Sequence, residues 1–181
     1  EAIFGVEERA VPASSVAGEA ASPTQPIPVK PPPMARVSFS LDDMVRAEHT
    51  SADHADACTD LLSRSGEFVN AGPYTPWTLR DGNGAGATTL LFPGLAGGPN
   101  WGGVAFDPNS SLAFVFAADL GTLGWLEATG EDFPYLLSLP RPSSFAVSID
   151  GQTLPCQEPP WSHLTAIDTT TGDIAWRIPL G

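Results

Sequence analysis

The sequence predicts an all-β fold, and three observations support this prediction. Short runs rich in β-branched and aromatic residues recur after residue 88, separated by turn-forming residues. The last two runs flank a tight turn at Thr170-Thr171-Gly172. Nineteen prolines and eighteen glycines in 181 residues are typical of strands joined by long irregular connections, while a hydrophobic content of 42% argues against general disorder.

Residues 1–35 are predicted to form a proline-rich extended arm. The segment 22–33 holds six prolines in twelve residues, and repeated proline blocks both helix and central strand, so we expect a backbone near polyproline II. A strap against its own protein is favoured over a ligand for an aromatic-lined groove. The start of the chain has neither the basic nor the apolar part of a signal peptide. We therefore expect the chain to be a portion of something longer.

Residues 36–70 are predicted to be a small helical hairpin inserted between β elements. The segments 40–43 and 50–53 both resemble capping boxes, with an acid three residues after a hydroxyl. Gly66 is a suitable end for the second helix.

Residues 71–181 carry the strand signals and are predicted to form propeller blade strands. Leu112–Ala117 is expected to be a buried strand with 122–128 as its neighbour, and 129–161 is expected to be a long polar loop. Four short antiparallel strands with one long interruption match a blade of a β-propeller. The predicted strands are 88–92, 101–106, 112–117, 122–128, 163–168 and 173–180.

The charge balance excludes one class of partner. The formal net charge is -13, from 21 acidic and 8 basic side chains, and Lys30 is the only lysine. Because this charge repels a phosphate backbone and no basic cluster interrupts it, no nucleic acid is expected as a partner. No apolar run has the length needed to span a membrane.

Two cysteines, Cys58 and Cys156, leave two interpretations open. A disulfide would close a loop of nearly a hundred residues and could contribute up to about 4.7 kcal/mol in the chain-entropy model. The alternative is a pair of buried thiols. His54 lies one helical turn before Cys58, with His49 nearby, which suggests zinc; structural zinc requires four ligands at tighter spacing, so surface histidines beside a cysteine are the favoured interpretation.

The segment from Ala166 to Trp176 carries the most specific signal. Asp168 and Thr171 can satisfy the backbone of a tight turn, Gly172 can adopt a positive φ, and Trp176 can dock between adjacent sheets. This segment resembles the tryptophan-docking motif, Ala-x-Asp-x-x-Thr-Gly-x-x-x-Trp, of the eight-bladed quinoprotein dehydrogenases.

The resemblance covers nearly the whole chain, in order from residue 4 to 181. It extends to the glucose-dehydrogenase-like branch of the pyrroloquinoline quinone (PQQ)-dependent dehydrogenases. It implies that the chain is an internal portion, about two blades, of an eight-bladed propeller. The segments that carry it are Phe4-Gly5-Val6-Glu7-Glu8-Arg9-Ala10-Val11-Pro12, Ser22-Pro23-Thr24-Gln25-Pro26, Lys30-Pro31-Pro32-Pro33, Gly97-Gly98-Pro99-Asn100-Trp101-Gly102-Gly103, Phe106-Asp107-Pro108, Asp119-Leu120-Gly121-Thr122-Leu123-Gly124-Trp125, Leu154-Pro155-Cys156 and Pro159-Pro160-Trp161.

The resemblance implies a function for the intact protein. Its members bind PQQ and Ca²⁺, and a carboxylate base helps to move hydride from a sugar or alcohol to the quinone, after which electrons pass to a respiratory quinone or a cytochrome. A periplasmic location is implied, with membrane association through parts outside this chain as an option. The remaining propeller blades would be its structural partners.

Only two site residues transfer to this sequence, Asn100 and Trp101, as cofactor-binding residues. The family's catalytic Asp and Ca²⁺ ligands should lie before residue 1, so no catalytic residue and no metal ligand are assigned here, and the isolated chain is expected to be inactive. The sequence departs from the family at Phe116-Ala117-Ala118, where polar residues usually precede Asp119. This departure puts in doubt a polar contribution from this strand.

A second hypothesis belongs to a different class. The chain would be a non-catalytic β-propeller segment that acts as a scaffold or binding module. The presence or absence of an upstream catalytic Asp with Ca²⁺ ligands would discriminate between the two hypotheses.

Overall fold

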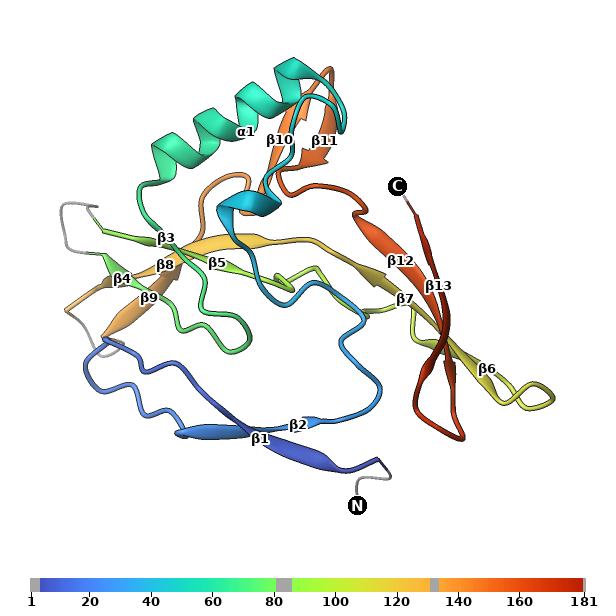
Figure 1. The fold of residues 1–181 in the computed structure, drawn as a ribbon. Coiled ribbons are helices and arrows are strands. Elements are labelled where there is room, and N and C mark those ends of the chain that lie inside the picture. The colour runs from blue at the N-terminus through green and yellow to red at the C-terminus, as the bar shows by residue number, and fades with distance from the viewer. Residues whose placement is uncertain (1–3, 81–85, 131–133, 181) are drawn as a thin grey trace.

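The computed structural model describes residues 4–80, 86–130 and 134–180, and most of its regular structure is β-strand (Figure 1). One α-helix, α1 (Ala52–Ser65), lies among these residues. No helix of the described part is long and apolar enough to cross a membrane. The strands are β1 (Val6–Ala10), β2 (Thr24–Pro28), β3 (Phe68–Val69), β4 (Leu79–Arg80), β5 (Thr88–Leu91), β6 (Val104–Asp107), β7 (Leu112–Ala118), β8 (Thr122–Ala128), β9 (Tyr135–Ser138), β10 (Ala146–Ile149), β11 (Gln152–Pro155), β12 (Ser162–Asp168) and β13 (Ile174–Pro179).

The predicted blade is present as a four-stranded sheet in the order β13-β12-β7-β6, with every neighbouring pair antiparallel. The turn between β12 and β13 has the predicted geometry. Gly172 has φ 74°, its N–H donates to the Asp168 carbonyl at 2.7 Å, and the Thr170 N–H donates to Asp168 Oδ1 at 2.8 Å. The prediction of an all-β, blade-containing fold is therefore confirmed.

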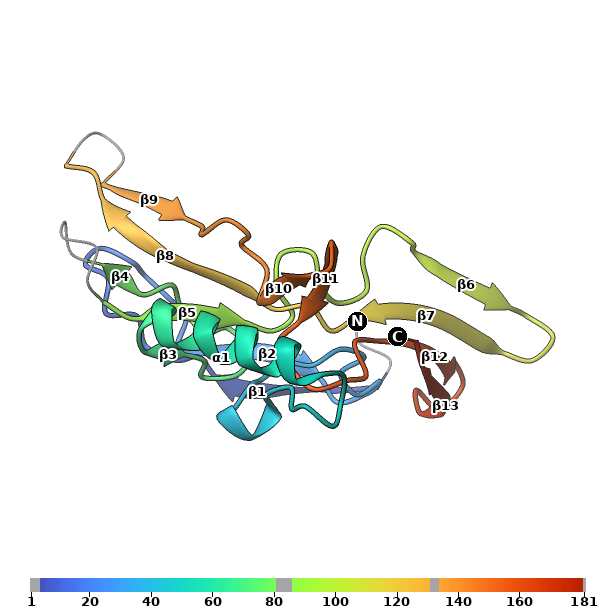
Figure 2. The same cartoon turned by 90° about the horizontal axis from the view of Figure 1, so that it is seen from above.

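The predicted pairing of 122–128 with 112–117 is wrong. β8 lies in a second sheet, in the order β3-β5-β8-β4 with β9 also paired to β8, and Leu90 of β5 is the partner of Leu123. Only residues 119–121 separate β7 from β8, and the two strands follow one another along the molecule (Figure 2). The linking residues bond to two other segments: the Asp119 N–H donates to the Trp161 carbonyl, and the Leu120 carbonyl accepts from the Gly94 N–H.

The segment predicted as a long loop, 129–161, contains β9, β10 and β11. β10 and β11 form a hairpin closed by Asp150 and Gly151, which have φ 50° and 79°. Positive φ at both central residues is the geometry that Asp-Gly favours in a two-residue hairpin turn. The dipeptide was therefore a readable hairpin signal within an otherwise polar segment.

The arm is extended, as predicted, but its two halves pair as the antiparallel strands β1 and β2. Both strands of a two-stranded sheet are edge strands. Pro26 and Pro28, which lack an N–H, are therefore tolerated here. The arm contacts the blade: Lys30 Nζ lies 2.7 Å from Asp173 Oδ1, and Arg177 Nη2 donates to the Pro33 carbonyl at 3.1 Å.

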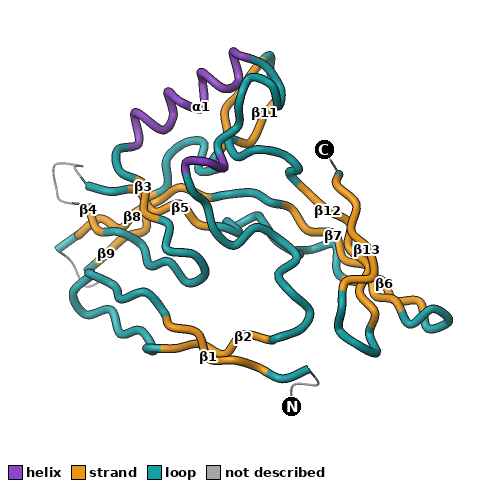
Figure 3. The backbone as a smooth tube through the Cα atoms, viewed as in Figure 1, coloured by secondary structure: helices purple, strands orange, loops and turns teal. Residues whose placement is uncertain are grey.

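Of the two segments predicted as capping boxes, only 50–53 lies at the start of an α-helix, and there Ser51, not Thr50, is the N-cap (Figure 3). Ser51 Oγ accepts from the His54 N–H at 3.2 Å, and α1 ends at Gly66 with φ 75°. The first box forms a single 3-10 turn at 41–43. The chain leaves this turn because Met44 and Val45 pair with the segment after β11, where the Val45 N–H donates to the Cys156 carbonyl at 2.9 Å.

A hydrophobic core joins α1 to the second sheet. Phe145, which is 1% exposed, packs edge-on against Phe39, Phe68 and Phe92, with ring centroids 5.0 to 6.4 Å apart. The buried members of this core are Val45, Cys58, Leu90, Phe92, Leu123, Phe145 and Cys156.

Candidate functional site

A glycine-rich segment, 94–103, carries the two predicted cofactor-binding residues. Its first half lies directly against the link between the sheets, where the Gly94 N–H donates to the Leu120 carbonyl at 2.7 Å. A Cβ on Gly97 would lie 2.6 Å from the Leu120 oxygen, so a side chain there would clash with backbone. These two glycines are therefore required by close packing within the chain and not by a ligand.

The second half of this segment projects into solvent. Gly98 and Ala118 exchange backbone hydrogen bonds of 2.7 and 3.2 Å, and the Gly103 N–H closes the turn on the Asn100 carbonyl at 3.1 Å. Asn100 is exposed and Trp101 is 97% exposed. A Cβ added at Gly103 would meet nothing within 4 Å. The turn thus presents an amide and an indole with free space beside them.

A buried carboxylate lies beside this turn, next in sequence to Ala118. Asp119 is 4% exposed, and its Oδ1 accepts from the Arg36 N–H at 2.5 Å. His163 Nδ1 lies 3.2 Å from Asp119 Oδ2, close enough for an ion pair, although it does not form a well-directed hydrogen bond. The Gln157 side-chain amide donates to the Asp119 carbonyl. Asp119 therefore fixes the segment that follows the arm, the end of β7 and the start of β12 relative to one another.

A cleft of about 250 Å³ opens above this carboxylate. Its two guanidinium groups already have partners: Arg36 Nη1 lies 3.0 Å from Asp43 Oδ1, and Arg177 Nε donates to Thr165 Oγ1 at 3.1 Å. The lining residues are Met34, Ala35, Arg36, Asp119, Pro160, His163 and Arg177.

The sequence interpretation missed this cluster. It placed an apolar strand before Asp119 and assigned no role to His163. The available signal was a charged residue at the end of a buried strand, at the place where the chain passes from one sheet to the next. No pattern in the sequence indicated that Arg36, which directly follows the arm, would come to the same point.

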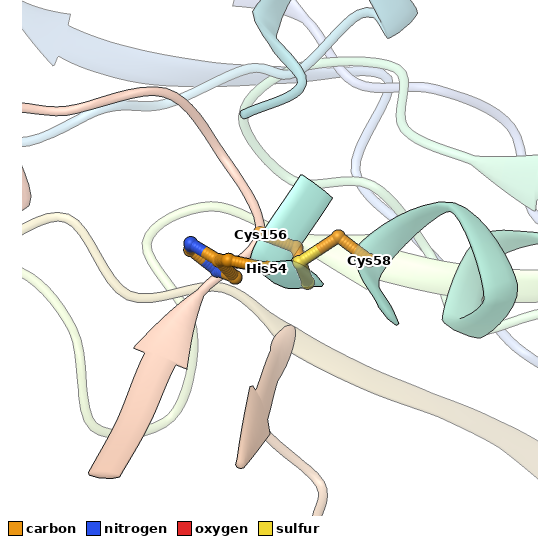
Figure 4. A group of neighbouring side chains, drawn as sticks. All are labelled: His54, Cys58 and Cys156. Carbon is orange, nitrogen blue, oxygen red and sulfur yellow. A yellow bond between two sulfur atoms is a disulfide. The ribbon is translucent and has the colours of Figure 1, made fainter. Parts of the chain in front are cut away.

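Cys58 and Cys156 form a disulfide, 98 residues apart in sequence, between α1 and the segment after β11 (Figure 4). His54 lies beside it and is fully buried, so its interpretation as a surface histidine is wrong. Its Nδ1 lies 2.8 Å from Thr50 Oγ1. Burial lowers the pKa of His54, although the backbone of Pro155 and Leu154 acts in the opposite direction.

His49 does not join this group. Its Nδ1 accepts a hydrogen bond from the Arg46 N–H at 3.2 Å. The described residues with metal-ligand spacing are therefore His54, Cys58 and Cys156, and the disulfide occupies both sulfurs.

Trp176 follows the predicted tight turn and stays partly exposed, at 39%. Its ring centroid is 5.8 Å from that of Phe114, on the same face of the blade, since both residues pair with Ala166. Phe116 and Ile178 on the same sheet are 48% and 45% exposed. A four-stranded antiparallel sheet with an apolar face open to a neighbour is the form of a β-propeller blade.

Comparison with known proteins identifies the family. All residues, 1–181, match the PQQ family described as glucose/ethanol/alcohol dehydrogenase, beta-propeller domain. The chain belongs to this family.

Several curated proteins are similar to the chain. It is 30% identical to quinate/shikimate dehydrogenase (quinone) of Acinetobacter baylyi, over 97% of the chain and 22% of that protein. It is 25% identical to quinoprotein glucose dehydrogenase of Escherichia coli, over 100% of the chain and 23% of that protein. It is 25% identical to the glycerol dehydrogenase large subunit of Gluconobacter oxydans, over 99% of the chain and 26% of that protein.

The chain thus spans between a fifth and a quarter of the length of the first curated relatives that it matches. No solved structure gives a significant match.

Proposed function

We propose that the chain is part of a PQQ-dependent dehydrogenase that oxidises a sugar or an alcohol by hydride transfer to the quinone. The observation that carries this proposal is the family match along residues 1–181. The names of the similar proteins include quinate, glucose and glycerol, which share hydroxyl-bearing carbons. Because the chain spans only part of these proteins, the activity is assigned to the assembled enzyme.

Asn100 and Trp101 would hold the cofactor in this proposal. The exposed amide can donate to an oxygen of a flat quinone acid, and the exposed indole offers a flat apolar surface. The open space beside Gly103 supports the fit of one edge of such a group. When bound, PQQ supplies the acceptor for the hydride. Asp119 would not contact the cofactor; it would position the turn that carries Asn100 and Trp101.

We place the Ca²⁺ ligands outside this chain. Ca²⁺ takes six to eight oxygen ligands. The described group with metal-ligand spacing offers sulfur and imidazole nitrogen instead, a set that suits softer metals.

The remaining blades of an eight-bladed propeller are the proposed partners of the blade in this chain. Phe116, Trp176 and Ile178 lie on a sheet whose apolar groups are about two-fifths to one-half exposed. A neighbouring blade would cover them, and Trp176 would then dock between two sheets.

A periplasmic location and a respiratory quinone or cytochrome as electron acceptor complete the proposal, with membrane association through segments outside the chain. The disulfide between Cys58 and Cys156 supports an oxidising compartment, where such bonds persist.

An Asn100→Ala variant of the enzyme with all its blades tests the cofactor assignment. We expect its dissociation constant for PQQ to rise by about tenfold or more, since tenfold corresponds to about 1.4 kcal/mol, the scale of one hydrogen bond to a charged group. Asn109→Ala is the matched control, because Asn109 is an exposed turn asparagine whose N–H donates to Asp107 Oδ1.

The dissociation constants for PQQ of the two variants should therefore differ. Equal affinity for PQQ in both would contradict the role of Asn100. Failure of the unmodified enzyme to bind PQQ would favour the scaffold or binding-module hypothesis.

A further inference from the structure

The disulfide lies within a group of three soft metal ligands. One ring nitrogen of His54 and the sulfurs of Cys58 and Cys156 all lie within 4.8 Å of one another. All three residues are fully buried. His54 and Cys58 project from successive turns of α1, and Cys156 approaches from the segment after β11 (Figure 4).

One atom of this group has no explained role. His54 Nε2 is buried and makes no well-directed hydrogen bond among the described residues, whereas Nδ1 has Thr50 Oγ1 at 2.8 Å. The backbone of Pro155 and Leu154 lies close enough to the ring to act on its pKa, and the ring packs edge-on against Trp161 with centroids 6.2 Å apart. These contacts account for a buried ring but leave Nε2 without a directed partner, and a buried polar atom without one costs about 1–3 kcal/mol.

We propose that the reduced form of this protein binds a thiophilic d¹⁰ cation, Zn²⁺ or Cu⁺, through Cys58, Cys156 and His54. A dithiol reductant supplies two electrons and two protons, which break the sulfur–sulfur bond and leave two thiols, while the dithiol becomes a disulfide. The cation then displaces both thiol protons, which pass to the buffer, and forms two bonds to sulfur and one to nitrogen. These three ligands complete a Cu⁺ site, and Zn²⁺ takes a water as its fourth ligand.

The distances suit this exchange. Bonds of about 2.3 Å to sulfur and about 2.0–2.1 Å to nitrogen place two ligand atoms of one metal site about 3.5–3.8 Å apart. The sulfurs must move apart after reduction, and the imidazole must close a gap of at most 4.8 Å. Rotations of three side chains cover such distances without a shift of α1. Thiolate and imidazole select Cu⁺ or Zn²⁺ over Ca²⁺ or Mg²⁺.

The consequence is a second way to join the same two segments. In the oxidised protein the disulfide ties α1 to the chain after β11, and in the reduced protein the cation would tie them. The core that surrounds Cys58 and Cys156 would then persist under both conditions.

The experiment titrates the protein, reduced with a thiol-free phosphine, with Zn²⁺ and in a separate anaerobic series with Cu⁺. We expect one cation per chain and a rise in the melting temperature of the reduced protein, because binding to the folded state stabilises it. The oxidised protein should bind neither. Co²⁺ in place of Zn²⁺ should give the sulfur-to-metal absorption of a two-thiolate site.

Two histidine variants provide the matched comparison. Loss of a residue that only supports a ligand costs about 10–100-fold in metal affinity. His54→Ala should therefore weaken binding by at least about tenfold, whereas His49→Ala should leave it unchanged.

Three results would each overturn the proposal. They are no binding by the reduced protein, equal affinity in the two histidine variants, and binding that lowers the melting temperature, which would place the metal on the unfolded chain.

Discussion

Apolar side chains are buried in the core around the disulfide but partly exposed in the blade β13-β12-β7-β6. In the core, Phe145 and Leu90 are 1% and 0% exposed and are covered by residues of this chain. In the blade, Phe116 and Ile178 lie on one face of the sheet and are 48% and 45% exposed. The core is therefore complete within this chain, whereas the blade has an apolar face that another sheet could cover.

This difference separates stability from assembly. Substitutions in the core should act on the chain itself, because each removes contacts that exist within it. Substitutions on the blade face should act only when the rest of the proposed propeller is present. The predictions below compare the two regions, from the largest expected effect to the smallest.

The sharpest comparison uses the same substitution in both regions. Phe145→Ala should lower the free energy of unfolding by about 3–5 kcal/mol, because it leaves a cavity among three aromatic rings. Phe116→Ala should change it by less than about 0.5 kcal/mol in the chain alone. Urea denaturation of both variants measures this, and similar losses at the two positions would break the distinction.

The disulfide should provide the next largest effect. The Cys58→Ser, Cys156→Ser double variant is expected to lose about 2–5 kcal/mol, since it releases a crosslink between residues 98 apart. Denaturation in metal-free buffer should show that a reductant destabilises the unmodified protein and leaves the variant unchanged. A reductant effect in the variant would contradict this origin.

A smaller effect is expected where the arm meets the blade. A Cβ on Gly172 would lie 2.9 Å from Phe4 Cδ2 and 3.0 Å from Lys30 Cβ, and φ at this residue is positive. Gly172→Ala should therefore cost about 1–2 kcal/mol and loosen the arm. Faster hydrogen exchange of β1 and β2 in the variant would show this. Gly151→Ala, in a turn with open space around it and a similar φ, is the control.

The smallest effect is a dependence on pH. Burial lowers the pKa of His54, so the unfolded chain binds a proton at higher pH than the folded one. Stability from this residue is fully present above the unfolded pKa of about 6.5 and is lost as pH falls below it. His54→Gln should remove this slope.

A second slope, below about pH 4, should remain in the His54→Gln variant. Hydrogen bonds from Thr170 lower the pKa of Asp168 in the turn before β13, so its contribution is lost as pH falls through the folded pKa. A variant with an unchanged slope near pH 6 would contradict the assignment to His54.

The sequence predicted the blade because its information is local. A continuous apolar run marks β7, and Asp168 and Gly172 specify the turn between β12 and β13 without help from distant residues. The pairing of β8 was mispredicted because its partners β5 and β4 lie far before it in sequence. No periodicity encodes such a partner.

The residues of the candidate site also differ in whether they are close together in sequence. Asn100 and Trp101 could be predicted as site residues because they lie together in a recognisable segment. Asp119, His163 and Arg36 were missed because three separate segments bring them together. His54 was wrongly predicted to be a surface residue. Helical periodicity places it on α1 but does not reveal the strand hairpin that covers it.

The central claim is that this chain supplies part of the propeller of a PQQ-dependent dehydrogenase. The most direct test is a titration with PQQ and Ca²⁺, followed by reduction of an artificial acceptor with sugars and alcohols, on this chain and on the protein extended to its natural ends. The account predicts that the extended protein binds PQQ and reduces the acceptor, and that the chain alone does not. An extended protein that binds no PQQ would contradict it.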